Sequence, residues 1–369
     1  MKIDAAVLFG TQEKYQVREI ELDGPRDTEV LVELTASGLC HSDDHAVTGD
    51  VPASFPLVAG HEGAGVVVEA GKQVTGLKAG DHVILHPVPN CGRCRWCSMG
   101  KAYLCDDGAF ALTGHAPDGS WRRRMDGQNI GAYCQLGTFA PMTTVSQNQV
   151  VKIDDDIPLH AAALIGCGVT TGFGAASKVG AVTAGDVVVV VGVGGVGTAA
   201  VQGARVSGAA VVVAVDPAEF RRTKALELGA THAFATIEEA TAVVGDLTHG
   251  VMADVTIIAV GVFHGEDLAG ILGLTAKSGR CVLTSISPVH ETTANVSLFD
   301  LGMMNKTLVG HIFGCGNPRA DFPRLLDLYR SGDLRLDEMI TTRYSLDQIN
   351  DGYAAMHAGT TVRGVVAYK

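Results

Sequence analysis

The chain has 369 residues, and its 28 lysines and arginines stand against 40 aspartates and glutamates, for a formal net charge of −12 at pH 7. This balance argues against a nucleic-acid partner, because phosphate binding needs a basic patch and the densest basic run is only residues 122–124. The N-terminus has no apolar stretch of signal-peptide length, so we expect a cytoplasmic protein without a membrane segment. The length suits two domains of ordinary size.

Residues 1–169 predict a mostly antiparallel, barrel-like domain. Short strand patterns alternate there with glycine and proline turns, which is typical of such domains. The expected strands are residues 30–34, 64–69, 82–85 and 143–145.

Four cysteines within this domain predict a structural zinc site. The C-x₂-C-x₂-C-x₇-C spacing lets one loop bring four thiolates to a tetrahedral ion, and it comprises Cys91, Cys94, Cys97 and Cys105. All four ligands come from the protein, so no coordination position is left for a substrate. Disulfides fit poorly with an acidic chain that lacks a secretory signal. An iron–sulfur cluster is the competing metal site.

A second cysteine and histidine set is scattered along the chain. Cys40, His61 and Cys167 make a Cys₂His set, which leaves a zinc coordination position open for water or substrate. The acidic Asp43 and Glu62 lie beside these ligands, where they can orient the imidazole and tune the charge. A lone cysteine or histidine is more often a core residue. The nearby four-cysteine loop, called the zinc lobe below, favours a second zinc instead.

Residues 170–307 predict a doubly wound parallel sheet. Strands are expected at residues 187–191, 211–215, 254–260 and 280–285, alternating with helical segments. The first strand enters a G-x-G-x-x-G turn and then a helix over 196–206. The turn comprises Gly192, Gly194, Gly195, Val196 and Gly197. Such glycines let a pyrophosphate approach the positive end of the helix, so this segment predicts dinucleotide binding.

Asp216 ends the second strand nineteen residues after Gly197, where an acidic residue receives the adenosine ribose hydroxyls. Its carboxylate would repel the additional phosphate of NADP, so NAD is preferred. Arg221 and Arg222 follow closely and either weaken this preference or form a solvated helix face over residues 219–228. NADP is therefore not excluded.

Residues 308–369 are expected to return to the first domain. A helix is predicted near 319–331, and Ser345-Leu346-Asp347-Gln348 has the form of a capping box at the start of another helix. A closing strand over 362–368 would rejoin the first domain.

Taken as a set, these motifs resemble the zinc-dependent medium-chain alcohol dehydrogenases over essentially the whole chain. The matching segments are residues 38–43, 60–65, 91–105, 166–172 and 192–197. Residues 2–19 and 215–217 resemble most the actinobacterial nitrosodimethylaniline-dependent branch, whose members are nicotinoproteins that hold NAD(H) tightly. The resemblance implies an α/β fold, with a GroES-like barrel-type catalytic domain at 1–169, a Rossmann domain at 170–307 and a return to the catalytic domain at 308–369.

The resemblance also implies roles around the catalytic zinc. The zinc ligands would be Cys40, His61 and Cys167. Ser42 would hydrogen-bond the alcohol, and His45 would pass its proton to solvent, a surface histidine being the alternative. Asp43 would hold His61, and Glu62 would lie behind the metal.

Cofactor contacts are implied in the same way. The residues expected to line the nicotinamide pocket are Thr171 and Val196. Asp216 and Arg221 would hold the adenosine ribose, and Arg363 the pyrophosphate. His41 stands where several relatives have an arginine, which puts a second pyrophosphate contact in doubt.

The implied activity is hydride transfer between a primary or secondary alcohol and NAD(H), giving an aldehyde or ketone. The resemblance also implies two zinc ions per subunit and a small-molecule alcohol or aldehyde as substrate. The chain is expected to form a homo-oligomer, either a dimer or a tetramer. Candidates for the substrate pocket are Val51, Pro87, Phe110 and Phe139.

Two alternatives remain. A thiol-dependent formaldehyde dehydrogenase would use mycothiol rather than glutathione, because residues 106–110 lack the arginine of the glutathione-using relatives. A zinc-lobed binding protein without activity is disfavoured by the intact Cys₂His set.

Overall fold

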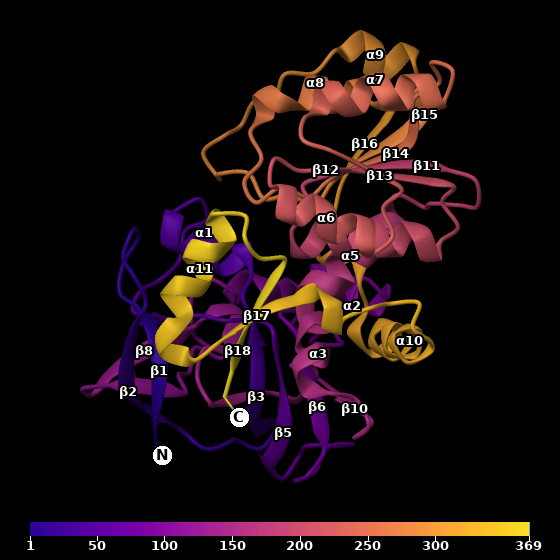
Figure 1. Cartoon of the computed structure of the whole chain (residues 1–369). Coiled ribbons are helices and arrows are strands. Elements are labelled where there is room, and N and C mark those ends of the chain that lie inside the picture. Colours follow the sequence, from indigo (N-terminus) through magenta and orange to yellow (C-terminus); the bar gives the residue numbers. More distant parts are fainter. Residues whose placement is uncertain (369) are drawn as a thin grey trace.

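The computed structural model describes residues 1–368, and its N-terminal domain is built on a small barrel and a larger sheet (Figure 1). In spatial order the barrel strands are β1 (Lys2–Leu8), β2 (Gln16–Leu22), β7 (Arg123–Met125), β8 (Gln128–Ala132) and β4 (Leu57–Val58). The larger sheet runs in the order β10 (Val150–Ile153), β6 (His82–Leu85), β5 (Gly63–Ala70), β3 (Glu29–Gly38), β18 (Arg363–Ala367) and β17 (Ile340–Tyr344). Most pairs are antiparallel, which confirms the predicted barrel-type domain.

Strand β3 leads to the first of the predicted metal ligands. One edge of β3 pairs with β5, and its other edge pairs first with β9 (Met142–Ser146) and then with β18. Because β18 comes from the end of the chain, the C-terminal segment rejoins the first domain, as predicted. Strand β3 ends at Gly38, two residues before Cys40.

Six parallel strands form the sheet of the second domain. Their order is β13 (His232–Phe234), β12 (Val211–Val215), β11 (Val187–Val191), β14 (Ala253–Ile258), β15 (Thr275–Leu283) and β16 (Thr307–Gly310). The order 3-2-1-4-5-6 is that of a dinucleotide-binding sheet. The four predicted strands are present, but the pattern missed the short β13 and β16. Strand β16 pairs with β15 up to Gly310, so the predicted boundary at 307 falls within a strand.

Alternating valines divide between the two faces of this sheet, as the two-residue period of a strand requires. Val188 and Val190 pack in one cluster with Val201, while Val189 packs in another with Val244. Helices therefore cover both faces, as Figure 1 shows. These helices are α5 (Gly195–Val206) and α6 (Glu219–Glu227) on one side, and α7 (Ile237–Leu247), α8 (Leu268–Gly273) and α9 (Leu298–Met303) on the other.

A 21-residue helical segment, Leu159–Val179, links the two domains. It comprises α3 (Leu159–Leu164), α4 (Thr170–Gly174) and π-helical turns at 165–169 and 175–179. An 18-residue window of this segment has a mean hydropathy of 1.4, which would suit a membrane span by length and composition alone, but 72% of the window is buried inside the protein, as in a core helix. The predicted boundary between 169 and 170 falls within this helix, so no linker separates the domains there.

The remaining helices lie in the N- and C-terminal segments. They are α1 (His41–Thr48), α2 (Arg95–Ser98), α10 (Pro318–Ser331) and α11 (Ile349–His357). The predicted capping box is present, with Ser345 and Gln348 bonding reciprocally. It begins a short 3₁₀ turn that leads into α11.

Candidate metal and cofactor site

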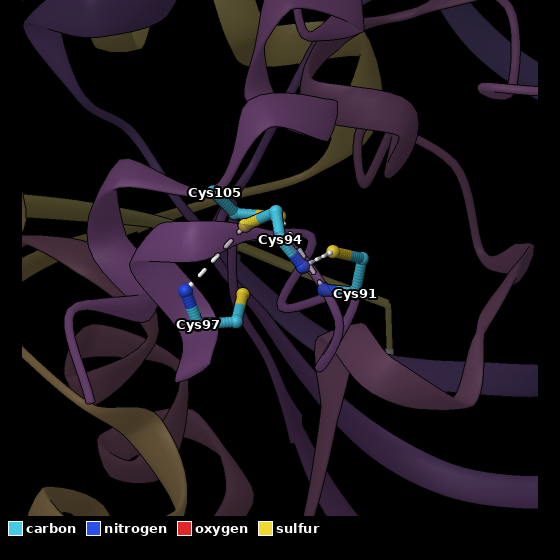
Figure 2. A group of neighbouring side chains, drawn as sticks. All are labelled: Cys91, Cys94, Cys97 and Cys105. Carbon is cyan, nitrogen blue, oxygen red and sulfur yellow. Dashed lines mark hydrogen bonds between the residues drawn. The ribbon is translucent and has the colours of Figure 1, made fainter. Parts of the chain in front are cut away.

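The four lobe cysteines converge in one loop (Figure 2). Their sulfur atoms all lie within 4.8 Å of one another, and none forms a disulfide. The N–H groups of Cys94 and Cys97 donate to the sulfur atoms of Cys91 and Cys94, each over 3.4 Å. Backbone donors favour a thiolate, and the Cys97 N–H lowers the pKa of Cys94 to about 7. Four clustered thiols with such donors fit a tetrahedral zinc ion.

The scattered set also comes together. Cys40 immediately precedes α1, His61 precedes β5, and Cys167 lies in the first π-helical turn, yet their ligand atoms lie within 4.8 Å of one another. His61 Nδ1 lies 2.9 Å from Asp43 Oδ2, and Asp43 Oδ1 accepts from the Gly60 N–H over 2.7 Å. His61 Nε2 is buried and has no hydrogen-bond partner within residues 1–368. An imidazole nitrogen left without a partner beside two thiols fits a metal ion.

Glu62 was expected only behind the metal, but its carboxylate belongs to the same 4.8 Å group. Its Oε1 accepts from the Gly168 N–H over 3.0 Å, and its Oε2 forms an ion pair with Arg363. Burial raises the pKa of Glu62 to about 8, while the Arg363 guanidinium opposes that shift. Glu62 is thus a further potential metal ligand that the sequence did not identify as one.

Arg363 has a different partner from the one expected. The sequence assigned its guanidinium to a pyrophosphate, but the structure pairs it with Glu62 and buries it. The same side chain lies against the glycine turn, since a Cβ at Gly195 would come within 2.2 Å of Arg363 Cδ. Arg363 therefore stands between the metal-site residues and the turn, and its phosphate contact stays a prediction.

Ser42 and His45 lie on α1, which begins immediately after Cys40. The Cys40 thiol donates towards Ser42 Oγ over 3.7 Å. His45 is 1% exposed, so the alternative of a surface histidine is wrong. Its Nδ1 lies 3.0 Å from Asp50 Oδ2, a partner that sequence reasoning missed. An acidic residue in the turn after a helix carries no distinctive pattern, so nothing in the sequence marked Asp50.

The glycine turn has the backbone that a dinucleotide site requires. Gly192 has a φ of 84°, and a Cβ at Gly197 would lie 1.8 Å from the Gly192 carbonyl oxygen. Side chains are excluded at both positions, so the strand and helix can meet closely. Asp216 is buried, and its two oxygens accept from the Val193 and Ala218 N–H groups over 3.0 and 2.9 Å.

Arg221 was expected at the adenosine ribose, but its guanidinium serves the backbone instead. Its Nε donates to the Thr361 carbonyl over 3.1 Å and its Nη2 to the Met356 carbonyl over 2.6 Å. The side chain thereby ties α6 to the C-terminal segment. It still lines the cavity, so a ribose contact would have to share these bonds.

A single cavity of about 1020 Å³ joins the metal-site residues to the glycine turn. Predicted residues in its lining are Cys40, His41, Ser42, His45, His61, Cys167, Thr171, Gly192, Gly194, Gly195, Val196, Asp216, Arg221 and Arg363. Of the expected substrate-pocket residues, Val51 and Pro87 line it as well. Phe139 is wrong because it is fully buried in the core, and Phe110 lines a separate cavity of about 500 Å³. Sequence reasoning missed Tyr133 and Cys134, which also face the main cavity.

The chain matches the alcohol dehydrogenase GroES-like domain over residues 26–155 and the zinc-binding dehydrogenase model over 195–331. It is 48% identical to the NDMA-dependent alcohol dehydrogenase of Amycolatopsis methanolica, covering 100% of this chain and 99% of that protein. This chain belongs to the zinc-dependent medium-chain alcohol dehydrogenases. Within that family it lies near the actinobacterial NDMA-dependent (nitrosodimethylaniline-dependent) branch.

Other members of the family are similar over their whole length. The S-(hydroxymethyl)glutathione dehydrogenase of Paracoccus denitrificans is 35% identical, with 100% of both chains covered. The crystal structure of benzyl alcohol dehydrogenase from Acinetobacter calcoaceticus has a TM-score of 0.93 at 28% identity, again covering 100% of both chains. The dehydrogenase family, its fold and its zinc and NAD(H) cofactors agree with the sequence-based expectations.

Proposed function

We propose that this alcohol dehydrogenase oxidises a small primary or secondary alcohol with NAD⁺ at a zinc ion held by Cys40, His61 and Cys167. The observation that carries the proposal is the single cavity that joins these three donors to the glycine turn. The zinc lobe would hold a second, structural zinc, and an acceptor such as NDMA would regenerate a retained cofactor, as the name of the Amycolatopsis methanolica relative suggests.

When bound, zinc supplies a Lewis acid that lowers the pKa of an alcohol hydroxyl, and NAD⁺ accepts the hydride. The protein supplies orientation and a route for the proton. Ser42 Oγ lies beside Cys40, where it can accept the alcohol proton. Asp50 accepts from His45 Nδ1, which leaves Nε2 free to take up the proton and release it to solvent. Asp43 Oδ2, 2.9 Å from His61 Nδ1, would hold the His61 ring and leave the unpartnered Nε2 for the metal ion.

The thiol-adduct alternative gains no support from the cavity. A glutathione or mycothiol adduct carries several polar groups, and glutathione adds carboxylates that need cationic partners. Among the described residues that line the cavity, the only arginines are Arg221 and Arg363, and both are bonded within the chain. An ordinary alcohol therefore suits the cavity better.

We infer that the chain forms a homo-oligomer in the cytoplasm. Strand β16 is the edge of the six-stranded sheet, and an unpaired edge is a template for a second strand. Large apolar side chains are exposed on β16 and in the segments that adjoin it in sequence, namely Leu298, Phe299, Met303, Leu308 and Ile312. A second copy pairing along β16 would cover them, which light scattering of the purified protein can test.

Denaturing the purified protein and measuring what it releases tests the proposed function. We expect two zinc ions and close to one NAD(H) per chain, together with alcohol-dependent reduction of NDMA before denaturation. Zinc without retained cofactor would instead indicate an ordinary NAD-exchanging dehydrogenase. Failure to reduce either NAD⁺ or NDMA with any of a panel of alcohols would contradict the activity itself.

Cofactor choice gives a second expected outcome. Asp216→Gly should shift preference towards NADP by one to two orders of magnitude, because losing hydrogen bonds to a charged acceptor costs roughly 1.4 to 3 kcal/mol. The measurement is the affinity of both cofactors for reconstituted apoprotein, since a retained cofactor exchanges slowly. Asp216→Asn is a second variant that removes the charge and keeps one oxygen to accept the Val193 N–H, although its NH2 group then faces the Ala218 N–H. An unchanged preference in both variants would remove Asp216 from the ribose site.

A further inference from the structure

A third cluster of metal-binding side chains lies outside both zinc sites described above. His41 and Asp44 come from the first turn of α1, and His357 comes from the end of α11. One ligand atom from each lies within 4.8 Å of the other two. We propose that these three residues bind a divalent transition-metal ion, with zinc as the expected occupant, at the edge of the cofactor cavity.

The contacts within the cluster favour a shared ion. His357 Nε2 lies 2.7 Å from Asp44 Oδ2, so these two groups already face each other. The ring of His41 lies 6.1 Å from that of His357 but forms no hydrogen bond or ion pair within residues 1–368. Asp44 is 5% exposed, which places a carboxylate in a nearly dry position beside an imidazole without a partner. A cation bound by all three would satisfy that ring and neutralise the carboxylate.

The donor set selects the kind of ion. Two imidazoles with one carboxylate suit zinc, cobalt or nickel, whereas magnesium and calcium prefer oxygen ligands alone. Zinc bonds to nitrogen and oxygen are about 2.0 to 2.2 Å long, so tetrahedral ligand atoms lie roughly 3.3 Å apart. The His357 side chain is 53% exposed and can make this small approach without repacking the core. Three protein ligands leave one position open.

The position of this site predicts an effect on cofactor release, and this prediction rests on the proposed cofactor site. His41 lines the main cavity, and its ring packs against Gly261 of the second domain, where a Cβ would lie 2.5 Å from His41 Nε2. An ion holding His41 would keep this ring fixed at the junction of the two domains. Zinc at the third site should therefore slow the release of NAD(H).

Equilibrium dialysis of the holoenzyme against micromolar zinc chloride tests the site directly. We expect the wild type to take up about one zinc per chain beyond the two tightly held ions. His357→Ala should keep those two and lose the additional one. His290→Ala is the matched control, because it removes an exposed histidine of the second domain and should retain the additional zinc. Equal uptake by His357→Ala and the wild type would overturn the site.

The release of NADH, followed by its fluorescence, tests the consequence separately. Zinc should slow release by roughly 5-fold or more in the wild type, a modest coupling between two sites, and should leave His357→Ala unaffected. Additional zinc uptake with an unchanged release rate would overturn the link to the cofactor. The zinc count needs no turnover, so its outcome is independent of whether the proposed activity is correct.

Discussion

Serine in place of Cys94 is expected to lower the melting temperature by about 10 °C, because loss of a structural metal is among the few changes that cost more than about 4 kcal/mol. Cys94 accepts the Cys97 N–H and belongs to a closed set of four thiols, so the binding energy of its ion is folding energy. Calorimetry and zinc content measure the effect, and we expect one zinc per chain instead of two. Soluble yield should fall as well.

Two further cysteine variants serve as a comparison and a control for this result. Cys167→Ser should leave a folded protein that still binds NAD but has almost no turnover, because Cys167 belongs to the open set beside the cavity. Cys315→Ser, outside both sets, is the control for the chemical change alone and should alter the melting temperature little. A Cys94→Ser protein as stable as the Cys315→Ser control would show that the lobe has no structural role.

Replacing Ser42 with alanine is expected to lower alcohol oxidation by roughly 100-fold or more, within the range for a lost proton-transfer group. Ser42 Oγ lies 3.7 Å from the Cys40 sulfur and lines the cavity, so it is the proposed first acceptor of the alcohol proton, which alanine cannot replace. Steady-state kcat measured with NDMA as acceptor reports the loss. Zinc and NAD(H) contents should remain those of the wild type.

His45→Gln is the milder companion to this change. It should cost about 10-fold at neutral pH, at or below the low end for an acid–base group, and small exogenous bases should restore part of the rate. Glutamine keeps a side chain of similar length beside Asp50 but cannot carry a proton. A pH–rate profile identical to that of the wild type would show that the proton leaves through water and not through His45.

Local patterns were sufficient for several of the strands and for the metal donors. The valine runs at 187–191 and 211–215 became strands with the predicted bounds, because a strand buried on both faces needs continuous apolar residues. The lobe cysteines lie close together in sequence, so their spacing alone placed them around one point. The pattern missed β13 and β16, because strands of three and four residues are too short to show a clear periodicity.

Residue types and spacing by themselves determined the fold class, the two cysteine-containing metal sets and the dinucleotide turn. Only the tertiary structure decided how the long polar side chains are partnered. Arg363 pairs with Glu62, 301 residues away, and Arg221 bonds to carbonyls of the C-terminal segment, because both arginines are held among groups brought together by the return of β18 to β3. The local sequence does not indicate such distant partners, because a flexible guanidinium can bond to any acceptor that the packing of the chain brings within its reach.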